Sequence, residues 1–472
     1  MTPEQIMLFY SARDARTVSY GSAAESLHAE VVLVIGTAAA SRPGQVALLG
    51  LANMMARTHR HFTIEVPPLP LVASSLIPAA CISEAVSRTI LAANPAARLI
   101  VNGRRVDTND IPDPPGRRVS AAIGADIIGD FDMWLGWAGG RGLLHTRPVS
   151  TSAANSGVLG AATVACMAAG ALFQRSNNQQ VRPGAVNLVE RTSAGGDDVA
   201  TAATDAAVIG GVGISTITGP IDAGDVAIVG AGAVAHSLGW WATEFGHRGS
   251  WSVIDGDDAE LSNTNRCMAM SAADAGWPAG LPGAPARAKA DILADFLHAE
   301  PVPTWFDTRT PAARPDLVLI LANERGVRAH AAALGEPILL HATTSSSWTA
   351  ELHRHVPTAD DCPACRIPAA TTPTFACSTG PVGPEPSAGD SALPFLSAAA
   401  GLMLTVALYQ LAPGEPLIAG RHNHWRMSFE RGVGLHPSVH APRCPHTLSP
   451  AARRALHTAQ PRRHDHLDPA HR

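Results

Sequence analysis

The stretch that decides the fold is Asp225–Gly239, which reads DVAIVGAGAVAHSLG. The apolar run DVAIVG predicts a buried parallel strand, and the residues after the glycines predict a helix. Gly230 allows a tight turn, Gly232 lets the backbone approach a phosphate, and Ala235 allows the helix to pack closely on the strand. Because the helix N-terminus would face an anion, the stretch predicts a nucleotide site rather than a structural turn. It does not distinguish NAD from ATP.

Strand and helix patterns continue on the C-terminal side of this stretch. The next strand, SWSVID, ends at Asp255, where a carboxylate can bind ribose hydroxyls. A Rossmann-like α/β domain is therefore expected, since strands alternate with helices. Its further elements are predicted as a helix at 284–298, strands at 316–321 and 337–343, and an Ala-rich helix at 395–411.

The first half of the chain repeats this order weakly. VVLVIG (31–36), a helix at 44–57 and HFTIEV (61–66) predict a second β-α-β unit, and an Ala-rich helix follows at 157–174. The Pro-rich residues 67–150 are predicted to be irregular, with strand-like pieces such as RLIVNG (98–103). VVLVIGTAAASRPG has no G-x-G, so we interpret this half as a degenerate, non-nucleotide-binding α/β domain. Two unrelated α/β domains are the alternative.

Composition limits the class of protein. The chain has 472 residues and a net charge of −5; 46% of residues are hydrophobic and 16% are charged. These values exclude a disordered chain and argue against nucleic-acid binding, which normally needs a basic excess. The apolar runs 157–173 and 395–409 are shorter than a membrane-spanning helix, and the N-terminus lacks the pattern of a secretory signal. Seven cysteines, an odd number, argue against a disulfide framework and favour a reducing compartment, so a cytoplasmic protein is expected.

The residues after Asp255 carry a longer motif. They read VIDGDDAELSNTNRCMAM and then ARAKADILADFL. Over roughly residues 224–447 the chain resembles the ThiF/MoeB/ubiquitin-activating superfamily of adenylating enzymes, which carries D-x-D-x-V-x-x-S-N-L-N-R-Q followed by a lysine. Asp255 and Asp257 match the two acidic residues, Ser262–Arg266 match S-N-L-N-R, and Lys289 matches the lysine.

The resemblance implies a function. It implies an ATP-dependent adenylyltransferase that activates the C-terminal glycine carboxylate of a ubiquitin-like or sulfur-carrier protein, or of a peptide. Arg266 and Lys289 would neutralise the charge that builds at the α-phosphate. The nucleotide and its Mg²⁺ would be bound by Gly230, Gly232, Asp255, Asp257, Asn263, Asn265, Arg266, Lys289 and Asn323.

Two positions depart from the family pattern. Cys267 replaces the family's Gln, and Asn323, in LILANERGVR, replaces an Asp that helps to hold Mg²⁺. An amide oxygen is a weaker ligand for a hard dication than a carboxylate. Either Glu324 or the ATP phosphates compensate, or adenylation is slow or lost.

Cysteines near the C-terminus suggest a structural zinc ion. Cys362-Pro-Ala-Cys365 is a C-x-x-C knuckle, and the resemblance implies a second pair that keeps Cys444. Thr447 stands at the partner position, so His446 or His440 would supply the fourth ligand of a Cys₃His site. Three buried cysteines without metal are the alternative.

Cys377, in PTFACSTGPVGPEP, lies in a Pro- and Gly-rich segment. Family members place a crossover-loop cysteine here, which takes the acyl group as a thioester or persulfide after adenylation. We therefore expect Cys377 to be a nucleophile. A free loop cysteine is the alternative, and Cys267 is a less favoured thiol.

The predicted organisation has three parts. Residues 1–222 form the degenerate domain, 223–450 the active domain and 451–472 a polar tail. The chain would work as a monomeric fused pseudo-dimer or as a homodimer. The degenerate domain would buttress the active one and could lend an arginine to the ATP site, and Arg42 and Arg57 lie near the degenerate loop.

Two remaining stretches are interpreted as structural and are given no functional role. His341–Pro357 is expected at the sheet edge with surface histidines, and Trp240 and Trp241 are expected in the core. Two other functions remain open: a non-catalytic scaffold that binds nucleotide or a partner, and an NAD(P)-dependent oxidoreductase, which rests on the glycine loop alone.

Overall fold

The structure is a computed structural model. It describes residues 1–18, 27–107, 109, 116–152, 157–190, 192–195, 217, 219–278, 285–306, 315–322, 327, 338–355, 360–361, 393–411, 423–430 and 432–438.

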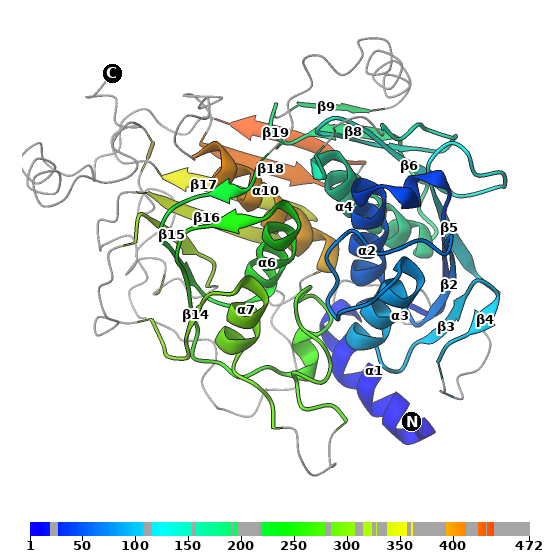
Figure 1. Ribbon diagram of the computed structural model, residues 1–472, viewed down its shortest axis with the longest axis horizontal. Helices are drawn as coiled ribbons and strands as arrows, with labels where there is room; N and C mark the ends of the chain where they lie inside the picture. Colours follow the sequence, from blue (N-terminus) through cyan, green and yellow to red (C-terminus); the bar gives the residue numbers. More distant parts are fainter. Residues whose placement is uncertain are drawn as a thin grey trace, which may run out of the picture.

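Two large sheets organise the chain, one in each half (Figure 1). A nine-stranded sheet has the order β4-β3-β2-β1-β5-β6-β7-β8-β9, and an eight-stranded sheet has the order β14-β13-β11-β15-β16-β17-β18-β19. β10 and β12 form a separate parallel pair. The strands are β1 (Glu30–Ile35), β2 (His61–Glu65), β3 (Arg98–Val101), β4 (Arg104–Arg105), β5 (Arg118–Ile123), β6 (Met133–Ala138), β7 (Arg141–His145), β8 (Gly184–Asn187), β9 (Thr192–Gly195), β10 (Ile221–Asp222), β11 (Val226–Val229), β12 (His247–Arg248), β13 (Trp251–Ile254), β14 (Glu300–Val302), β15 (Leu317–Ile320), β16 (Leu339–Ser345), β17 (Thr349–His355), β18 (His424–Ser428) and β19 (Gly434–Ser438). The helices are α1 (Pro3–Val18), α2 (Arg42–Ala56), α3 (Ile82–Ala93), α4 (Leu159–Ser176), α6 (Ala233–Phe245), α7 (Lys289–Leu297) and α10 (Pro394–Gln410), with 3₁₀ turns η2 (Thr37–Ala40) and η3 (Leu261–Asn263).

The two sheets have the same topology apart from β4, which pairs antiparallel with β3 at the edge of the first sheet. With β4 set aside, the first strand of each sheet lies in the middle, the second and third extend the sheet to one side, and the fourth and fifth extend it to the other. These five strands are parallel, and three antiparallel strands follow. The helices repeat as well. Along the chain, α2, α3 and α4 come between the strands of the first half in the same order as α6, α7 and α10 come between those of the second half. Both halves are therefore Rossmann-like α/β units with the same chain path, as the weak sequence repeat predicts.

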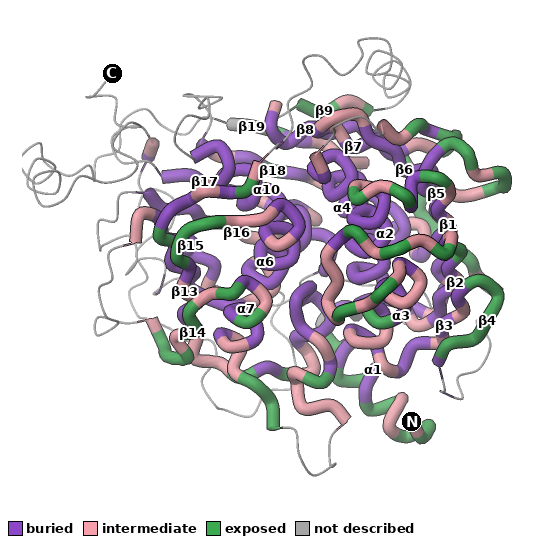
Figure 2. Tube along the Cα trace, viewed as in Figure 1, coloured by how far each residue is buried: buried purple, intermediate pink, exposed green. Residues whose placement is uncertain are grey.

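The helices between the two sheets form a continuous core (Figures 1 and 2). Small residues let these helices approach: a Cβ on Gly50 of α2 would lie 2.8 Å from Trp241 of α6. A Cβ on Gly401 of α10 would lie 2.5 Å from the backbone nitrogen of Leu238. Trp241 is fully buried and donates its indole N–H to the carbonyl of Ala398 at 2.9 Å, which confirms its predicted place in the core.

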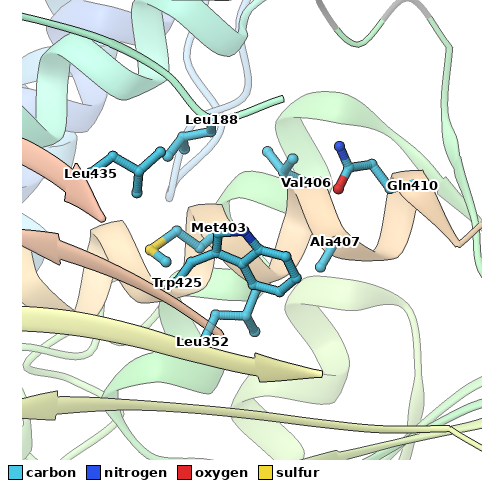
Figure 3. Close-up of a pocket in the computed structure, with 8 residues that line it drawn as sticks. All are labelled: Leu188, Leu352, Met403, Val406, Ala407, Gln410, Trp425 and Leu435. Carbon is cyan, nitrogen blue, oxygen red and sulfur yellow. The ribbon is translucent and has the colours of Figure 1, made fainter. Parts of the chain in front are cut away.

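A small apolar pocket lies where the two halves meet (Figure 3). Met403, Val406 and Ala407 of α10 form one wall, and Leu352 and Trp425 of the second sheet lie opposite. Leu188 reaches the pocket from the first half. Its lining lacks charged groups, so it is a packing gap in the core rather than a site with chemistry.

Three sequence expectations differ from the structure. Residues 67–150 were expected to be irregular apart from strand-like pieces such as 98–103. The strand at 98–103 is confirmed as β3, but the region also contains α3 and strands β4 to β7, because short amphipathic strands leave a weak signal among prolines. The helix expected at 284–298 begins only at Lys289. Residues 341–355 were expected at the sheet edge, yet they lie in β16 and β17, inside the eight-stranded sheet.

Among the described helices, none has both the length and the apolar character needed to cross a membrane.

Glu244 of α6 links the two halves through a buried carboxylate. It accepts the backbone N–H of Ser74 at 2.7 Å, and Arg42 of α2 lies 3.5 Å from its second oxygen. Burial raises the pKa of Glu244 to about 7, against an ordinary value of 4.5, although Arg42 opposes the shift. This contact therefore titrates near neutral pH.

The Glu244 contact predicts how stability depends on pH. Because the folded-state pKa is raised, the carboxyl's contribution is complete below pH 4.5 and is lost as pH rises towards 7. Between pH 4.5 and pH 7 the free energy of unfolding of the wild type should therefore fall by a value on the order of 3 kcal/mol, whereas that of Glu244→Gln should not. Urea unfolding of both proteins at pH 5 and pH 7.5 measures the difference. Parallel changes in the two proteins would contradict the assignment.

Candidate active site

The glycine turn after β11 is shaped for a ligand. Gly230 has φ +96°, and a Cβ there would lie 2.6 Å from the backbone nitrogen of Ala322, so this position requires glycine. Gly232 differs, since its φ is −86° and a Cβ there would meet nothing within 4 Å. It is the N-cap of α6 and offers no side chain to the helix N–H groups. Open space thus lies over the positive end of a helix, which suits a phosphate.

Asp255 ties the loop after β13 to the glycine turn. One carboxylate oxygen accepts the N–H of Ala231 at 2.6 Å, and the other accepts the N–H of Asp257 at 2.8 Å. Burial raises the pKa of Asp255, and the N–H of Asp257 partly offsets the shift. Asp255 therefore lies beside the glycine turn, and each of its oxygens already accepts a backbone N–H. The remaining lone pairs can accept ribose hydroxyls.

Asp257 and Lys289 form an ion pair beside this turn. The Lys289 Nζ atom lies 2.8 Å from the Asp257 carboxylate, and the Lys289 N–H donates to the Asp257 carbonyl at 2.9 Å. Both side chains are mostly buried. Burial disfavours the charged lysine, but the bond with Asp257 and the charge of Asp255 raise its pKa overall. The predicted lysine is thus held charged at the N-terminus of α7.

The Asn-x-Asn-Arg motif folds into a tight turn, η3. The Asn263 carboxamide accepts the N–H of Glu260 at 2.9 Å. Arg266 donates to the Ser262 carbonyl at 2.9 Å and to the Asn265 carboxamide at 2.7 Å, and it is 9% exposed. Cys267, which follows it, belongs to a buried apolar cluster against which Ala233, the first residue of α6, packs. The motif therefore lies near the start of α6.

Arg57, from the first half, holds this motif in place. Its fully buried guanidinium donates to the carbonyls of Thr264 at 2.6 Å, Met268 at 2.8 Å and Met270 at 3.0 Å, and to the Asn53 side chain at 2.7 Å. Burial lowers its pKa to about 9, so it stays charged at neutral pH. Arg57 thus binds backbone of the second half. Arg42, the other arginine considered, pairs with Glu244.

Two further first-half residues support the motif, and sequence reasoning missed both. Asn53 donates to the Met268 carbonyl at 3.0 Å, and Thr17 of α1 accepts a hydrogen bond from Asn265 at 3.1 Å. The signal that the sequence offers for Asn53 is its place one turn before Arg57 in a mostly apolar helix. Their partners lie more than 200 residues away, so spacing could not identify them.

The corresponding turn of the first half also holds a carboxylate. Gly36 follows β1 as Gly230 follows β11, but Asp126 lies directly against Gly36. The Asp126 carboxylate accepts the N–H of Thr37 at 2.7 Å, and this bond lowers the pKa of Asp126. The Asp126 carboxylate thus binds Thr37 as Asp255 binds Ala231 in the second half. The two halves differ at the helix that follows the turn: the Ser41 hydroxyl caps α2 by accepting the N–H of Gly44 at 3.1 Å, whereas Gly232 offers no side chain to α6.

The structure brings together eight of the predicted nucleotide-site residues that it describes, namely Gly230, Gly232, Asp255, Asp257, Asn263, Asn265, Arg266 and Lys289. Asn323, Glu324, the zinc candidates Cys362, Cys365, Cys444, His446 and His440, and the nucleophile candidate Cys377 lie outside the described residues.

No family model matches the chain, and no curated protein matches it. Among solved structures it is similar to E. coli MccB in complex with ATP, at 13% identity and a TM-score of 0.29 over 47% of this chain and 66% of that one. E. coli MccB with succinimide matches at 12% identity and a TM-score of 0.30, over 47% and 65%. PaaA matches at 16% identity and a TM-score of 0.27, over 46% and 64%. The chain thus spans slightly less than two thirds of the length of each, and the likeness does not identify a family.

Removing the Arg57 guanidinium should destabilise the whole chain. Arg57→Leu leaves three buried carbonyls without this donor, so we expect a loss in the free energy of unfolding on the order of 3 kcal/mol or more. Arg88→Ala is the matched control, because Arg88 pairs with Glu84 on the surface of α3. Its expected loss is below about 1 kcal/mol. Equal stability of the two variants in urea would show that Arg57 does not hold the halves together.

Proposed function

We propose that the chain is an ATP-dependent adenylyltransferase whose nucleotide site lies in the second half. The observation that carries the proposal is the open space over Gly232, at the N-terminus of α6, beside a charged lysine and a motif arginine. A triphosphate is an anion, and anions bind at helix N-termini and at turns where backbone N–H groups can come close to them. Asp255 would accept the ribose hydroxyls.

Lys289 and Arg266 supply the positive charge that adenylation needs. In that reaction a carboxylate oxygen bonds to the α-phosphorus, the bond from this phosphorus to the bridging oxygen breaks, and pyrophosphate leaves. Negative charge builds on the phosphoryl oxygens, and pre-positioned cations stabilise it. The Asp257 ion pair fixes Lys289, and the contacts with Ser262 and Asn265 fix Arg266. Neither side chain would need to reorganise far.

The substrate and acceptor are proposed from the resemblance of the motif residues. The carboxylate would be the C-terminal glycine of a ubiquitin-like or sulfur-carrier protein, or of a peptide. Asp257 and Asn323 would hold Mg²⁺ with the ATP phosphates, and Cys377 would take the acyl group. Cys362, Cys365, Cys444 and either His446 or His440 would bind a structural zinc ion, as a Cys₃His set does.

A non-catalytic scaffold that binds nucleotide is the second candidate. Asn323 favours it, because a neutral amide replaces the carboxylate expected at the Mg²⁺ position. The two candidates share the nucleotide site and differ only in turnover. They therefore separate on whether pyrophosphate forms.

Filling the space over Gly232 should abolish nucleotide binding without unfolding the protein. A Cβ there meets no atom of the chain within 4 Å and the backbone φ is negative, so Gly232→Val should fold normally. Its side chain would occupy the phosphate position, and we expect at least a tenfold rise in the ATP dissociation constant, or about 1.4 kcal/mol. Calorimetric titration with Mg-ATP measures it.

The first-half turn supplies the control for that titration. Asp126→Asn removes the carboxylate charge beside the first-half turn but should leave ATP affinity and a stoichiometry of one nucleotide per chain unchanged. Wild-type affinity in Gly232→Val, or loss of binding in Asp126→Asn, would place the nucleotide elsewhere.

Turnover should depend on the Lys289 charge. ATP–pyrophosphate exchange, measured with a protein or peptide that ends in glycine, should fall by about 10²-fold or more in Lys289→Ala, as for removal of one transition-state donor. Lys289→Arg should retain more of the exchange, because it keeps the cation. Nucleotide binding without exchange in the wild type would instead support the scaffold. Exchange that is unaffected in Lys289→Ala would refute the role of this lysine.

A further inference from the structure

Histidines form a row across the eight-stranded sheet. The pairing registers align Val229 of β11 with Ile320 of β15, and Ile320 with His341 of β16. They continue from His341 to His353 of β17, and from His353 to His424 of β18. This row of paired residues is therefore apolar on β11 and β15 and consists of histidines on β16, β17 and β18. All of these side chains lie on one face of the sheet.

Glu351 joins this row. It lies two residues before His353 on β17, so both side chains are on the same face. The intervening Leu352 points to the other face, into the core packed on α10. The imidazole cluster is thus on the opposite face from the interhelical core and from the apolar pocket of Figure 3.

Three ligand atoms converge on one point. The Nε2 atoms of His424 and His353 lie 3.4 Å and 3.8 Å from the same Glu351 oxygen, Oε2. One ligand atom from each residue lies within 4.8 Å of the other two. Ligands at about 2.0–2.1 Å from a tetrahedral zinc ion are about 3.3 Å apart, so a small inward rotation of these side chains would complete the set.

Donor chemistry and access also fit a metal ion. The set offers one carboxylate oxygen and two imidazole nitrogens, which are ligand atoms that zinc accepts. The rings of His353 and His424 stack with centroids 4.2 Å apart. The three side chains are 22%, 12% and 13% exposed, so an ion can enter and retain a solvent ligand.

The fold itself does not demand this cluster. β6 and β7 of the first sheet correspond to β16 and β17, and their face away from the helices carries Trp134, Leu143 and His145. Leu143 stands two residues before His145, as Glu351 stands before His353. The first half therefore has one histidine and no carboxylate where the second half has the converging set.

We propose that Glu351, His353 and His424 bind one divalent transition-metal ion of the zinc class. Two imidazoles and one carboxylate are a recognised protein set for zinc and for iron, and they leave coordination positions open to water or substrate. β17 is three strand spacings from β11, or roughly 14 Å, so the ion would lie within reach of a substrate that extends from the phosphate turn. This site is separate from the cysteine set and does not depend on the proposed adenylation.

Cobalt(II) titration of the full-length, chelator-treated protein tests the site. A nitrogen–oxygen site gives visible d–d bands without the intense near-ultraviolet thiolate charge transfer that a cysteine set gives. We expect one equivalent of cobalt with such bands in the wild type. His424→Gln and Glu351→Gln should weaken that binding at least tenfold, while His145→Gln, the matched first-sheet histidine, should leave it unchanged.

Thermal unfolding gives a second readout that also checks folding. Zinc should raise the melting temperature of the wild type and of His145→Gln, because a ligand that binds only the folded state stabilises it. Glu351→Gln, nearly the same size as the native residue, should fold and lose the part of this shift that arises from the site. Wild-type cobalt bands in His424→Gln, or a full zinc shift in Glu351→Gln, would overturn the proposal. A metal-free Glu–His hydrogen-bond cluster would then explain the geometry.

Discussion

The buried guanidinium of Arg57 is the interaction on which the candidate site depends. It enters from helix α2 of the first half and donates to three backbone carbonyls between Thr264 and Met270 of the second. Those carbonyls belong to the segment that ends the Asn-x-Asn-Arg motif. A buried cation without a carboxylate partner is costly, and it is tolerated only where several acceptors surround it. The cation thus fixes the loop that presents Arg266, and it makes the first half part of the site.

The two halves share a topology and differ in chemistry. In the first, the Ser41 hydroxyl caps the helix that follows the turn after β1, whereas the helix after β11 begins at Gly232, which has no side chain and open space around it. On the outer face of the second sheet, Glu351, His353 and His424 converge, whereas the corresponding strands of the first sheet carry Trp134, Leu143 and His145. The two halves therefore differ in the groups that they leave available to a ligand.

Sequence alone could predict the parts that depend on local pattern. The glycine turn and the α6 helix follow from short-range pattern, whereas Asp257 and Lys289 were identified through the resemblance of the motif; the structure describes all of them close together. The sequence offered Arg57 as one of two candidate arginines, but its contacts could not be predicted, because its acceptors are backbone atoms more than 200 residues away. The histidine row was missed for a related reason: its alignment depends on the register of three strands, and β18 lies about 70 residues beyond β17. Register is a property of pairing, which local sequence does not specify.

The most direct test of this asymmetry is backbone amide exchange in the presence of Mg²⁺ and a non-hydrolysable ATP analogue. The account predicts slower exchange in peptides covering 230–236 and 255–266, where the phosphate turn and the clamped motif lie. It predicts no change in peptides covering 36–41, where the Ser41 hydroxyl already caps the helix. Protection at 36–41, or no protection at 230–236, would contradict it.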